Sequence, residues 1–330
     1  MNSNVSYITE IPVVDLDATV LGANAFLEVW QKRKLAFQTL LHDLVKRHVD
    51  ALALYQKALM ANARRSVANL EQSPFELMIE ALAEGADPEI IELARSQADD
   101  FKRELSNLIA ELDKSSKAFA SLPELDERNE KTRLTGERKS LEDQCARHKA
   151  QSEADREKLD KIKAAVAALE SKELQLDLSN LLPSAEQLSQ LAAPGGQAKL
   201  ALDTATQAMK DLEKVAGLIQ EGMRYAELKE QQRKLADALL AQEQAFMSMQ
   251  RKIAEIDNNL EALADVPVLM QHRSAVLSDA QKLLLVLNGI STRLQYMPIQ
   301  SAPDIADVAQ VFNQLLFVQQ RMLEQVNRIV

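Results

Sequence analysis

Histidine side chains are the first candidates for chemistry in this chain, and their spacing predicts no metal or catalytic site. A zinc hydrolase motif places two histidines four residues apart, with a glutamate after the first, and no such pair occurs here. His42 and His48 are six residues apart, which separates them by about 120° around a helix. The sequence therefore predicts that all four histidines flank helix contacts or lie on the surface: His42, His48, His148 and His272.

The single cysteine, Cys145, can form neither an intrachain disulfide nor a thiolate zinc site. It follows Leu141 by four residues and precedes His148 by three, a spacing typical of a packed helix face. The sequence also lacks the glycine-rich phosphate loops and nucleophile elbows of nucleotide-binding proteins and hydrolases. We predict no enzyme activity, no catalytic residue, no metal and no cofactor.

The charged residues are expected to be helix-surface charges. The net charge of -10, from 39 basic and 49 acidic residues, opposes nucleic-acid binding, which needs a basic stripe to neutralise phosphates. Any membrane binding would therefore depend on apolar area rather than on attraction to anionic lipid. The run that contains Glu153, Asp155, Glu157 and Lys158 is typical of a solvated helix face.

The most unusual segment covers residues 178–198, where Glu186 is the single charged residue in a chain that is 27% charged. It is longer than the connection that an antiparallel helix pair needs. Burying a leucine is worth ~1.5–3 kcal/mol, and we expect no core near this segment. Its leucines would therefore contact a membrane or a protein. The alternative is an ordinary loop whose leucines cover the helix ends.

The elements that must position this segment are predicted to be helices, so the fold class is all-α. The chain has only eight Gly, nine Pro and 4% aromatic residues, a composition typical of long helices and coiled coils. Apolar residues recur at helical spacing and do not alternate as in strands. The expected helices cover about residues 15–72, 74–85, 88–120, 267–297 and 303–330 and, if each proline-free arm is one helix, 124–182 and 197–266.

The two arms predict a long antiparallel coiled-coil hairpin. At ~1.5 Å per residue they would run roughly 90 and 105 Å, so we expect an elongated, rod-like multi-helix bundle. The second arm carries a heptad stripe with 4-3 spacing, which indicates a supercoiled contact with one polar position. The stripe consists of Leu235, Leu239, Gln242, Phe246, Met249, Ile253, Ile256, Leu260 and Leu263.

Apolar density divides the chain into three predicted parts. Residues 1–123 and 235–330 would form a tail bundle, because the densest apolar faces lie there. Residues 124–158 and 220–234 would form a coiled-coil neck, and residues 159–219 a head with an apolar tip. The proline spacing does not recur at the roughly 100 residues that spectrin-like three-helix repeats would require.

This layout resembles the B subunit of alpha-xenorhabdolysin-type binary cytotoxins, which are cytolysin-A-like helical pore-forming toxins. The shared features are a long N-terminal helix, a short proline-bounded insert, a long hairpin with an apolar apex (NLLPSAEQLSQLAAPGGQ, 180–197) and C-terminal helices that return to the bundle. The resemblance implies one subunit of a two-component toxin that permeabilises target-cell membranes. It also implies an A-type partner subunit and a ring-shaped hetero-oligomeric pore in the target-cell lipid bilayer.

The resemblance further implies a head over residues 174–202 that is compact in the soluble monomer and swings out on assembly. The membrane-contacting residues would be Leu174, Leu176, Leu178, Leu181, Leu182, Leu188, Leu191, Leu200 and Leu202. The expected turn and hinge residues are Pro183, Pro194, Gly195, Gly196, Gly217 and Gly222.

The N-terminus lacks the basic start and apolar stretch of a secretory signal. We therefore expect secretion without a cleavable signal peptide, followed by binding to host-cell membranes. The alternative function is a structural coiled-coil scaffold or tether without membrane activity.

Overall fold

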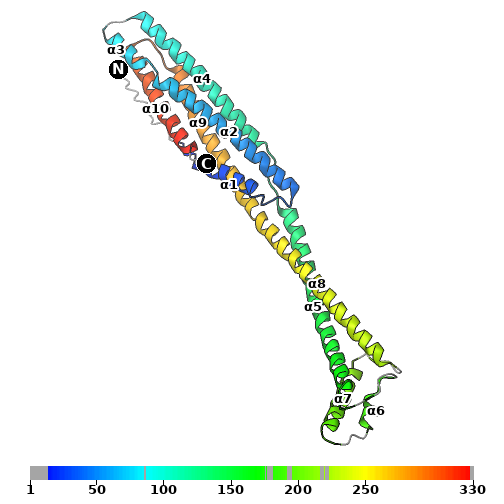
Figure 1. Cartoon of the computed structure of the whole chain (residues 1–330). Helices are drawn as coiled ribbons and strands as arrows, with labels where there is room; N and C mark the ends of the chain where they lie inside the picture. The colour runs from blue at the N-terminus through cyan, green and yellow to red at the C-terminus, as the bar shows by residue number, and fades with distance from the viewer. Residues whose placement is uncertain are drawn as a thin grey trace, which may run out of the picture. The chain divides into compact units, whose positions relative to one another are not determined.

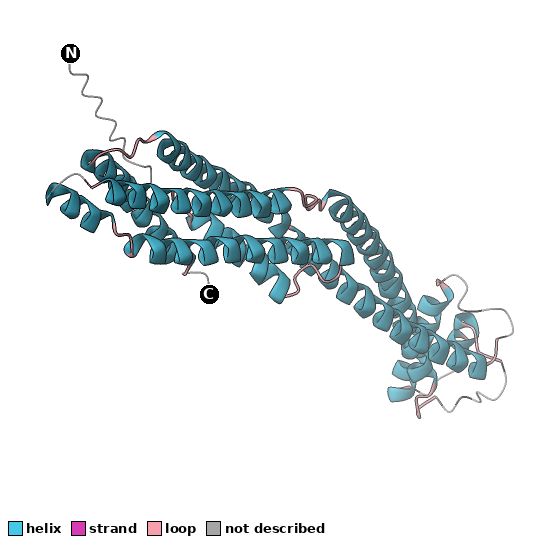
Figure 2. Cartoon of the chain, turned by 90° about the horizontal axis from the view of Figure 1, so that it is seen from above, coloured by secondary structure: helices cyan, strands magenta, loops and turns pink. Residues whose placement is uncertain are grey.

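The computed structural model describes residues 14–84, 87–174, 176, 181–191, 195–215, 219 and 223–327. Over these residues the fold is all-α, as predicted (Figures 1 and 2). The helices are α1 (Asp17–Gln31), α2 (Thr39–Glu71), α3 (Phe75–Glu84), α4 (Pro88–Ala120), α5 (Arg128–Leu169), α6 (Ala185–Ser189), α7 (Gln197–Glu213), α8 (Tyr225–Leu263), α9 (Asp265–Tyr296) and α10 (Ala302–Val326). Among the described residues, the one β-type pairing is an isolated bridge between Leu181 and Arg224.

Contacts divide the chain into two compact units. The first unit comprises Met1–Lys131 and Asn259–Val330, and the second unit comprises Thr132–Asn258. The finer division into tail bundle, neck and head stays a prediction.

The first unit is a helical bundle with a continuous apolar core. Helix α2 packs on α4 and α10, α1 packs on α2 and α9, and α3 packs on α10. The ring of Phe312 meets those of Phe75 and Phe101, with centroids 4.9 and 4.3 Å apart. In α4, apolar residues that recur at helical spacing are buried: Ala94, Ala98, Phe101, Leu105, Leu108, Leu112 and Phe119.

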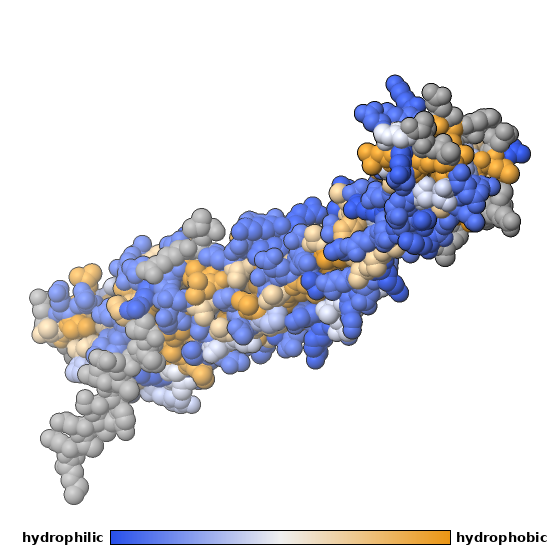
Figure 3. All heavy atoms as spheres, turned by 90° about the horizontal axis from the view of Figure 1, so that it is seen from below, coloured by the Kyte–Doolittle hydropathy of each residue, from blue (hydrophilic) through white to orange (hydrophobic). Residues whose placement is uncertain are grey.

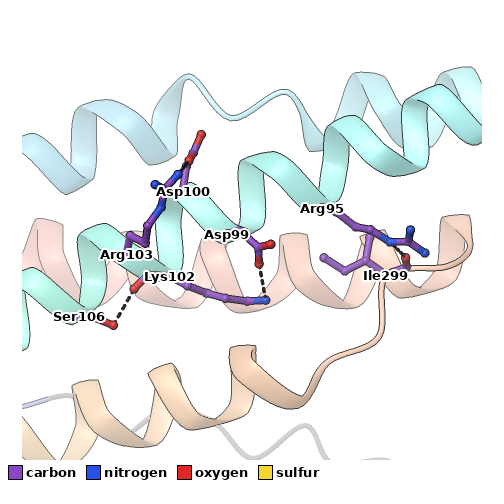
Figure 4. A network of polar contacts seen from close by, with 7 residues as sticks. All are labelled: Arg95, Asp99, Asp100, Lys102, Arg103, Ser106 and Ile299. Atoms are coloured by element: carbon purple, nitrogen blue, oxygen red, sulfur yellow. Dashed lines mark hydrogen bonds and ion pairs between the residues drawn. The ribbon is translucent and has the colours of Figure 1, made fainter.

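Helix α4 begins where the sequence predicts, at Asp87-Pro88. The Asp87 carboxylate accepts a hydrogen bond from the Glu89 backbone N–H at 2.8 Å, and proline suits the first helical position because it has no N–H to satisfy. Farther along, Arg95 Nε donates to the Ile299 carbonyl oxygen at 2.8 Å (Figure 4). This bond fastens α4 to the α9–α10 connection.

The predicted single helix over about 15–72 is wrong, because the chain turns between α1 and α2. Arg33 adopts a left-handed conformation with φ 52°, although the segment contains neither glycine nor proline. Leu35 is fully buried, and Lys34 Nζ lies 2.8 Å from a carboxylate oxygen of Asp265 in α9. The burial of Leu35 and the ion pair of Lys34 therefore stabilise a turn that no glycine or proline in the segment predicts.

The predicted histidine positions are wrong for His48, which is fully buried in the first unit. Its ring stacks on Phe26 of α1 and meets Phe119 of α4 edge to face, at centroid distances of 5.1 and 5.7 Å. Nδ1 lies 2.8 Å from the Leu44 carbonyl oxygen, so Nδ1 carries the proton of the neutral ring. The imidazole serves as a core aromatic because three helices supply rings or backbone around it.

The second unit contains an antiparallel pair formed by α5 and α8, which lie side by side (Figure 1). Arg138 of α5 pairs with Asp257 at 2.7 Å, whereas Glu170, which directly follows α5, pairs with Lys229 at 2.6 Å. The partners move toward the start of α8 as α5 advances, which defines the antiparallel direction. Every residue of the predicted heptad stripe is buried or half-buried, which confirms that the stripe is a packed face.

Neither predicted arm is one continuous helix. Helix α5 ends at Leu169 rather than near residue 182, and the second arm divides into α7 and α8. The absence of proline permits a long helix but does not enforce one. Gly217 and Gly222 fall between α7 and α8, outside the described residues, and each glycine costs a helix ~1 kcal/mol relative to alanine.

Candidate membrane-contacting head

The head residues gather around two helices, α6 and α7, that pack on each other. A capping box starts α6: Gln187 N–H donates to Ser184 Oγ at 3.1 Å, and Ser184 N–H donates to Gln187 Oε1 at 2.9 Å. This reciprocal pair satisfies two backbone donors and fixes the short helix directly after Pro183. The Ala185 N–H also donates to Glu213 Oε1, at the end of α7, at 2.9 Å. Polar contacts therefore fix the start of α6 and join it to the end of α7.

The expectation that no core lies near the apex is wrong. Leu188 and Leu202 are buried among apolar residues of α5 and α7. The core forms because α7 packs its apolar stripe toward the last turns of α5. Its buried members are Ile162, Ala165, Val166, Leu169, Ala185, Leu188, Leu202, Ala205, Met209, Leu212, Met223 and Leu228.

The other predicted leucines divide into two groups. Leu174, Leu176 and Leu182 are half-buried and pack against the head core. Leu181, Leu191 and Leu200 are 61%, 47% and 69% exposed, although they are large apolar side chains. Figure 3 shows apolar side chains gathered on this part of the chain. Among the predicted leucines that the structure describes, these three are the exposed ones.

The predicted turn residues are described only in part. Gly195 and Gly196 have φ values of 86° and 65°, a left-handed conformation that favours glycine. They therefore serve as the turn before α7. Leu178, Pro194, Gly217 and Gly222 lie outside the described residues. Membrane contact and hinge bending by the predicted residues stay predictions.

A polar latch joins the residue that follows α5 to the first turns of α8. Glu170 accepts hydrogen bonds from Lys229 Nζ at 2.6 Å and from the Tyr225 hydroxyl at 2.5 Å. The Lys229 bond is the largest cause that lowers the pKa of Glu170. Beside it, Leu182 N–H donates to the Met223 carbonyl oxygen at 2.8 Å. Sequence reasoning missed this latch, although the four-residue spacing of Tyr225 and Lys229 places both on one helix face.

A second polar cluster lies on the α5–α8 contact and corrects the prediction that Asp155 is solvated. Asp155 is only 6% exposed and accepts hydrogen bonds from Gln151 at 2.9 Å, Gln242 at 3.1 Å and Lys158 at 3.1 Å. The Gln151 bond is the largest cause that lowers the pKa of Asp155, against the opposing effect of burial. The polar position of the heptad stripe, Gln242, is therefore the partner of a buried carboxylate.

Among the described residues, no group of three or more His, Cys, Asp or Glu side chains could hold a metal ion. None of the described helices combines the length and apolar content needed to cross a membrane. Cys145 is a free, half-buried thiol.

Comparison with known proteins gives matches at the level of structure. No protein-family model and no curated protein matches the chain. XaxB from Xenorhabdus nematophila matches with a TM-score of 0.79 and 16% identity, over 97% of this chain and 100% of that chain. PaxB from Photorhabdus luminescens matches with a TM-score of 0.75 and 15% identity, over 98% and 99%.

A chain of the XaxAB pore complex from Xenorhabdus nematophila also matches, with a TM-score of 0.62 and 15% identity, over 97% and 100%. These similarities define the class: the chain has an all-helical fold shared with proteins that occur in such complexes. More specifically, it has the fold of XaxB and PaxB across nearly its whole length. The resemblance inferred from the sequence is confirmed for the fold.

Proposed function

We propose that this chain is one subunit of a two-component α-helical pore-forming cytotoxin. It assembles with an A-type partner subunit on target-cell membranes and permeabilises them. One observation carries the proposal: the fold matches XaxB and a chain of the XaxAB pore complex over 97% of this chain. The match covers both compact units of the chain. It is therefore more specific than a match to a helical bundle alone, which many proteins contain.

The head supports contact with an apolar partner. Transfer of a leucine out of water is worth ~1.5–3 kcal/mol, so Leu181, Leu191 and Leu200 would each gain free energy in lipid or at a protein surface. The net charge of -10 makes attraction to anionic lipid a weak contribution. Assembly of this kind needs no covalent chemistry and no cofactor. We further propose that the chain is secreted and acts at the host-cell membrane.

Dye release from liposomes tests the proposal directly. The purified chain is mixed with a co-encoded helical homologue, and release is compared with that caused by each protein alone. We expect release only, or far more strongly, from the pair. Absence of release under every pairing would contradict the proposal and favour the structural scaffold.

A matched pair of variants tests the role of the head. Leu200→Asp places a charge at an exposed leucine in the first turn of α7, and Leu40→Asp does the same in the first turn of α2. Because both side chains are exposed, neither change should alter thermal unfolding. We expect Leu200→Asp to reduce dye release at least about tenfold, since a charge costs ~2.5–3.5 kcal/mol at a bilayer centre. Leu40→Asp should leave release unchanged; equal loss in both would remove the head from the mechanism.

A further inference from the structure

His48 of α2 lies where four helices of the first unit meet. Its ring stacks on Phe26 of α1, with centroids 5.1 Å apart, and meets the Phe119 ring of α4 edge to face at 5.7 Å. The guanidinium of Arg273 in α9 lies 6.0 Å from the centroid of the same Phe119 ring. Because His48 is fully buried, a titratable group is enclosed among aromatic rings with a cation close by.

Protonation of His48 would place a second positive charge in this part of the core. Nδ1 of the neutral ring already donates to the Leu44 carbonyl oxygen at 2.8 Å, so the added proton goes to Nε2. Nε2 is buried and has no hydrogen-bond partner within the described part of the chain. The charge of Arg273 also acts against protonation. Attraction of a cation to the Phe26 ring offsets only part of the cost of burying an unpaired charge.

The charged side chains of the surrounding helices face solvent or pair with one another. Those of α2 near His48 are exposed: Asp43, Lys46, Arg47 and Asp50. Glu124, whose carboxylate lies 3.7 Å from Arg273, is 78% exposed. Other carboxylates have cations of their own; the pairs are Glu28–Lys32 in α1, Asp113–Lys117 in α4 and Lys34–Asp265 at the start of α9.

Two further titratable side chains belong to the contact between α1 and α9. Asp279 is buried and accepts a hydrogen bond from the Thr19 backbone. Burial raises the pKa of Asp279, so its protonation favours the packed state as the pH falls, against the effect of His48. His272 is half-buried, and its Cβ lies 3.6 Å from a carbon added at Gly22. Both side chains therefore provide controls for a pH effect at His48.

Helix α1 is the element that can leave His48 at least cost. It has 15 residues, whereas α2, α4 and α9 have 33, 33 and 32. A side-chain carbon added at Gly22 would lie 2.6 Å from Val276 Cγ2, so α1 fits α9 too closely to shift by small steps. Just after α1, Arg33 adopts a left-handed φ of 52°, which is unfavourable for a residue with a side chain. Movement of α1 would relieve this conformation.

The side of His48 that faces α4 and α9 is held by hydrogen bonds. Arg273 of α9 donates to the carbonyl oxygens of Ala120 and Leu122 at 2.6 and 3.1 Å. Ala120 is the last residue of α4, and Leu122 lies in the connection that follows it. These bonds fasten α9 to the end of α4, so the core opens more easily on the side of α1.

We propose that protonation of His48 releases α1 from α2 and α9, while α2, α4 and α9 stay packed together. The open state lets water reach the imidazolium ring and exposes the apolar face of α1, which carries Ala23, Phe26 and Val29. In that state the pKa of His48 returns to about 6.5, whereas burial keeps it lower in the closed state. The opening equilibrium should therefore rise as the pH falls below ~6.5, by at most about tenfold per pH unit. The release needs neither a partner nor a membrane, so it goes beyond the proposed pore function.

Native-state hydrogen exchange of the full chain at pH ~7 and ~5.5 tests this release. Protection factors are compared, because they remove the pH dependence of the chemical exchange rate itself. We expect the α1 amides to lose protection by about threefold to tenfold, and the α4 and α9 amides to keep theirs. Unchanged protection of α1 would overturn the proposal. Equal loss in α1, α4 and α9 would also overturn it, because the whole unit would then be opening.

Variants assign the effect to His48. His48→Phe keeps a ring between Phe26 and Phe119 and cannot titrate, so its α1 protection should be the same at both pH values. His48→Gln, which is neutral and polar, is the second variant if the phenylalanine prevents folding. The control His272→Gln should lose α1 protection as wild type does, and Asp279→Asn should lose at least as much, because the opposing titration is gone. A pH response that survives in the His48 variants, or vanishes in His272→Gln, would overturn the proposal.

Discussion

The first unit surrounds its helices with apolar contacts on several sides, whereas the paired helices of the second unit share a narrow contact. Between Leu134 and Leu159, the one buried residue of α5 is a carboxylate, Asp155. In the first unit, the corresponding interior holds stacked aromatic rings such as those of Phe101 and Phe312. The fit of packed apolar side chains therefore determines how the helices of the first unit are arranged. In the second unit, hydrogen bonds determine the register of α5 against α8.

The largest expected effect breaks the aromatic core of the first unit. Phe312→Ala removes the ring that meets Phe75 and Phe101, and loss of a buried phenylalanine costs ~3–5 kcal/mol. Chemical denaturation should show a loss of this size in the free energy of unfolding. A loss below ~1 kcal/mol would mean that the core is not specified by shape.

The next effect concerns the polar contact of the second unit. Asp155→Ala leaves Gln242 without its partner, which should cost ~1–3 kcal/mol. The double variant Asp155→Leu with Gln242→Leu should recover most of that loss, because an apolar pair has no unpaired polar group. Hydrogen exchange of the α5 and α8 amides measures both changes. A double variant no more stable than Asp155→Ala would contradict the polar-register interpretation.

The stability of the first unit should depend on pH, because its core contains the titratable side chain of His48. Burial lowers the pKa of His48 below its ordinary value of 6.5, and the positive charge of Arg273 in α9 lowers it further, whereas the hydrogen bond to the Leu44 carbonyl opposes the shift. The unfolded state binds the proton on His48 more tightly than the folded state does. The contribution of neutral His48 to the free energy of unfolding is therefore fully present above pH ~6.5. It is lost as the pH falls from there through the folded-state pKa.

Urea denaturation at a series of pH values measures this loss, with His48→Phe as the comparison. The phenylalanine keeps an aromatic ring between Phe26 and Phe119 and does not titrate. We expect the variant to lose less stability between pH 7 and pH 5 than the wild type does. An identical pH profile for the two proteins would assign the acid sensitivity to other groups.

The smallest expected effect lies on the surface of the α5–α8 pair. Arg138→Ala removes an ion pair with Asp257 whose two side chains are both exposed. Exposed pairs contribute little and are screened by salt. The exchange rates of the α5 and α8 amides should therefore differ slightly between Arg138→Ala and wild type at low salt, and not at high salt. A large, salt-independent change would place specificity in surface charge rather than at Asp155.

Local signals account for what the sequence predicted well. Asp87-Pro88 announces the start of α4, and the 4-3 spacing announces the packed stripe of α8. The turn at Arg33 was missed because a distant ion pair and the burial of Leu35 stabilise it. Asp155 and His48 were misassigned because charge and titratability suggest exposure, whereas the partners that make burial possible lie far away in the sequence.

The head shows the same limit. The turn at Gly195 and Gly196 was foreseeable from composition, since glycine tolerates positive φ. The difference in burial between Leu188, which is buried, and Leu191, which is exposed, could not be predicted from the sequence. It depends on where α7 meets α5. Identical residue types three positions apart differ only through tertiary contacts.

The close approach of Gly22 to Val276 has an evolutionary consequence. A methyl group gained at position 22 would force Val276 to rotate or to shrink, so the two sites should change together among descendants of this gene. A lineage carrying alanine at position 22 should therefore carry alanine or glycine at position 276.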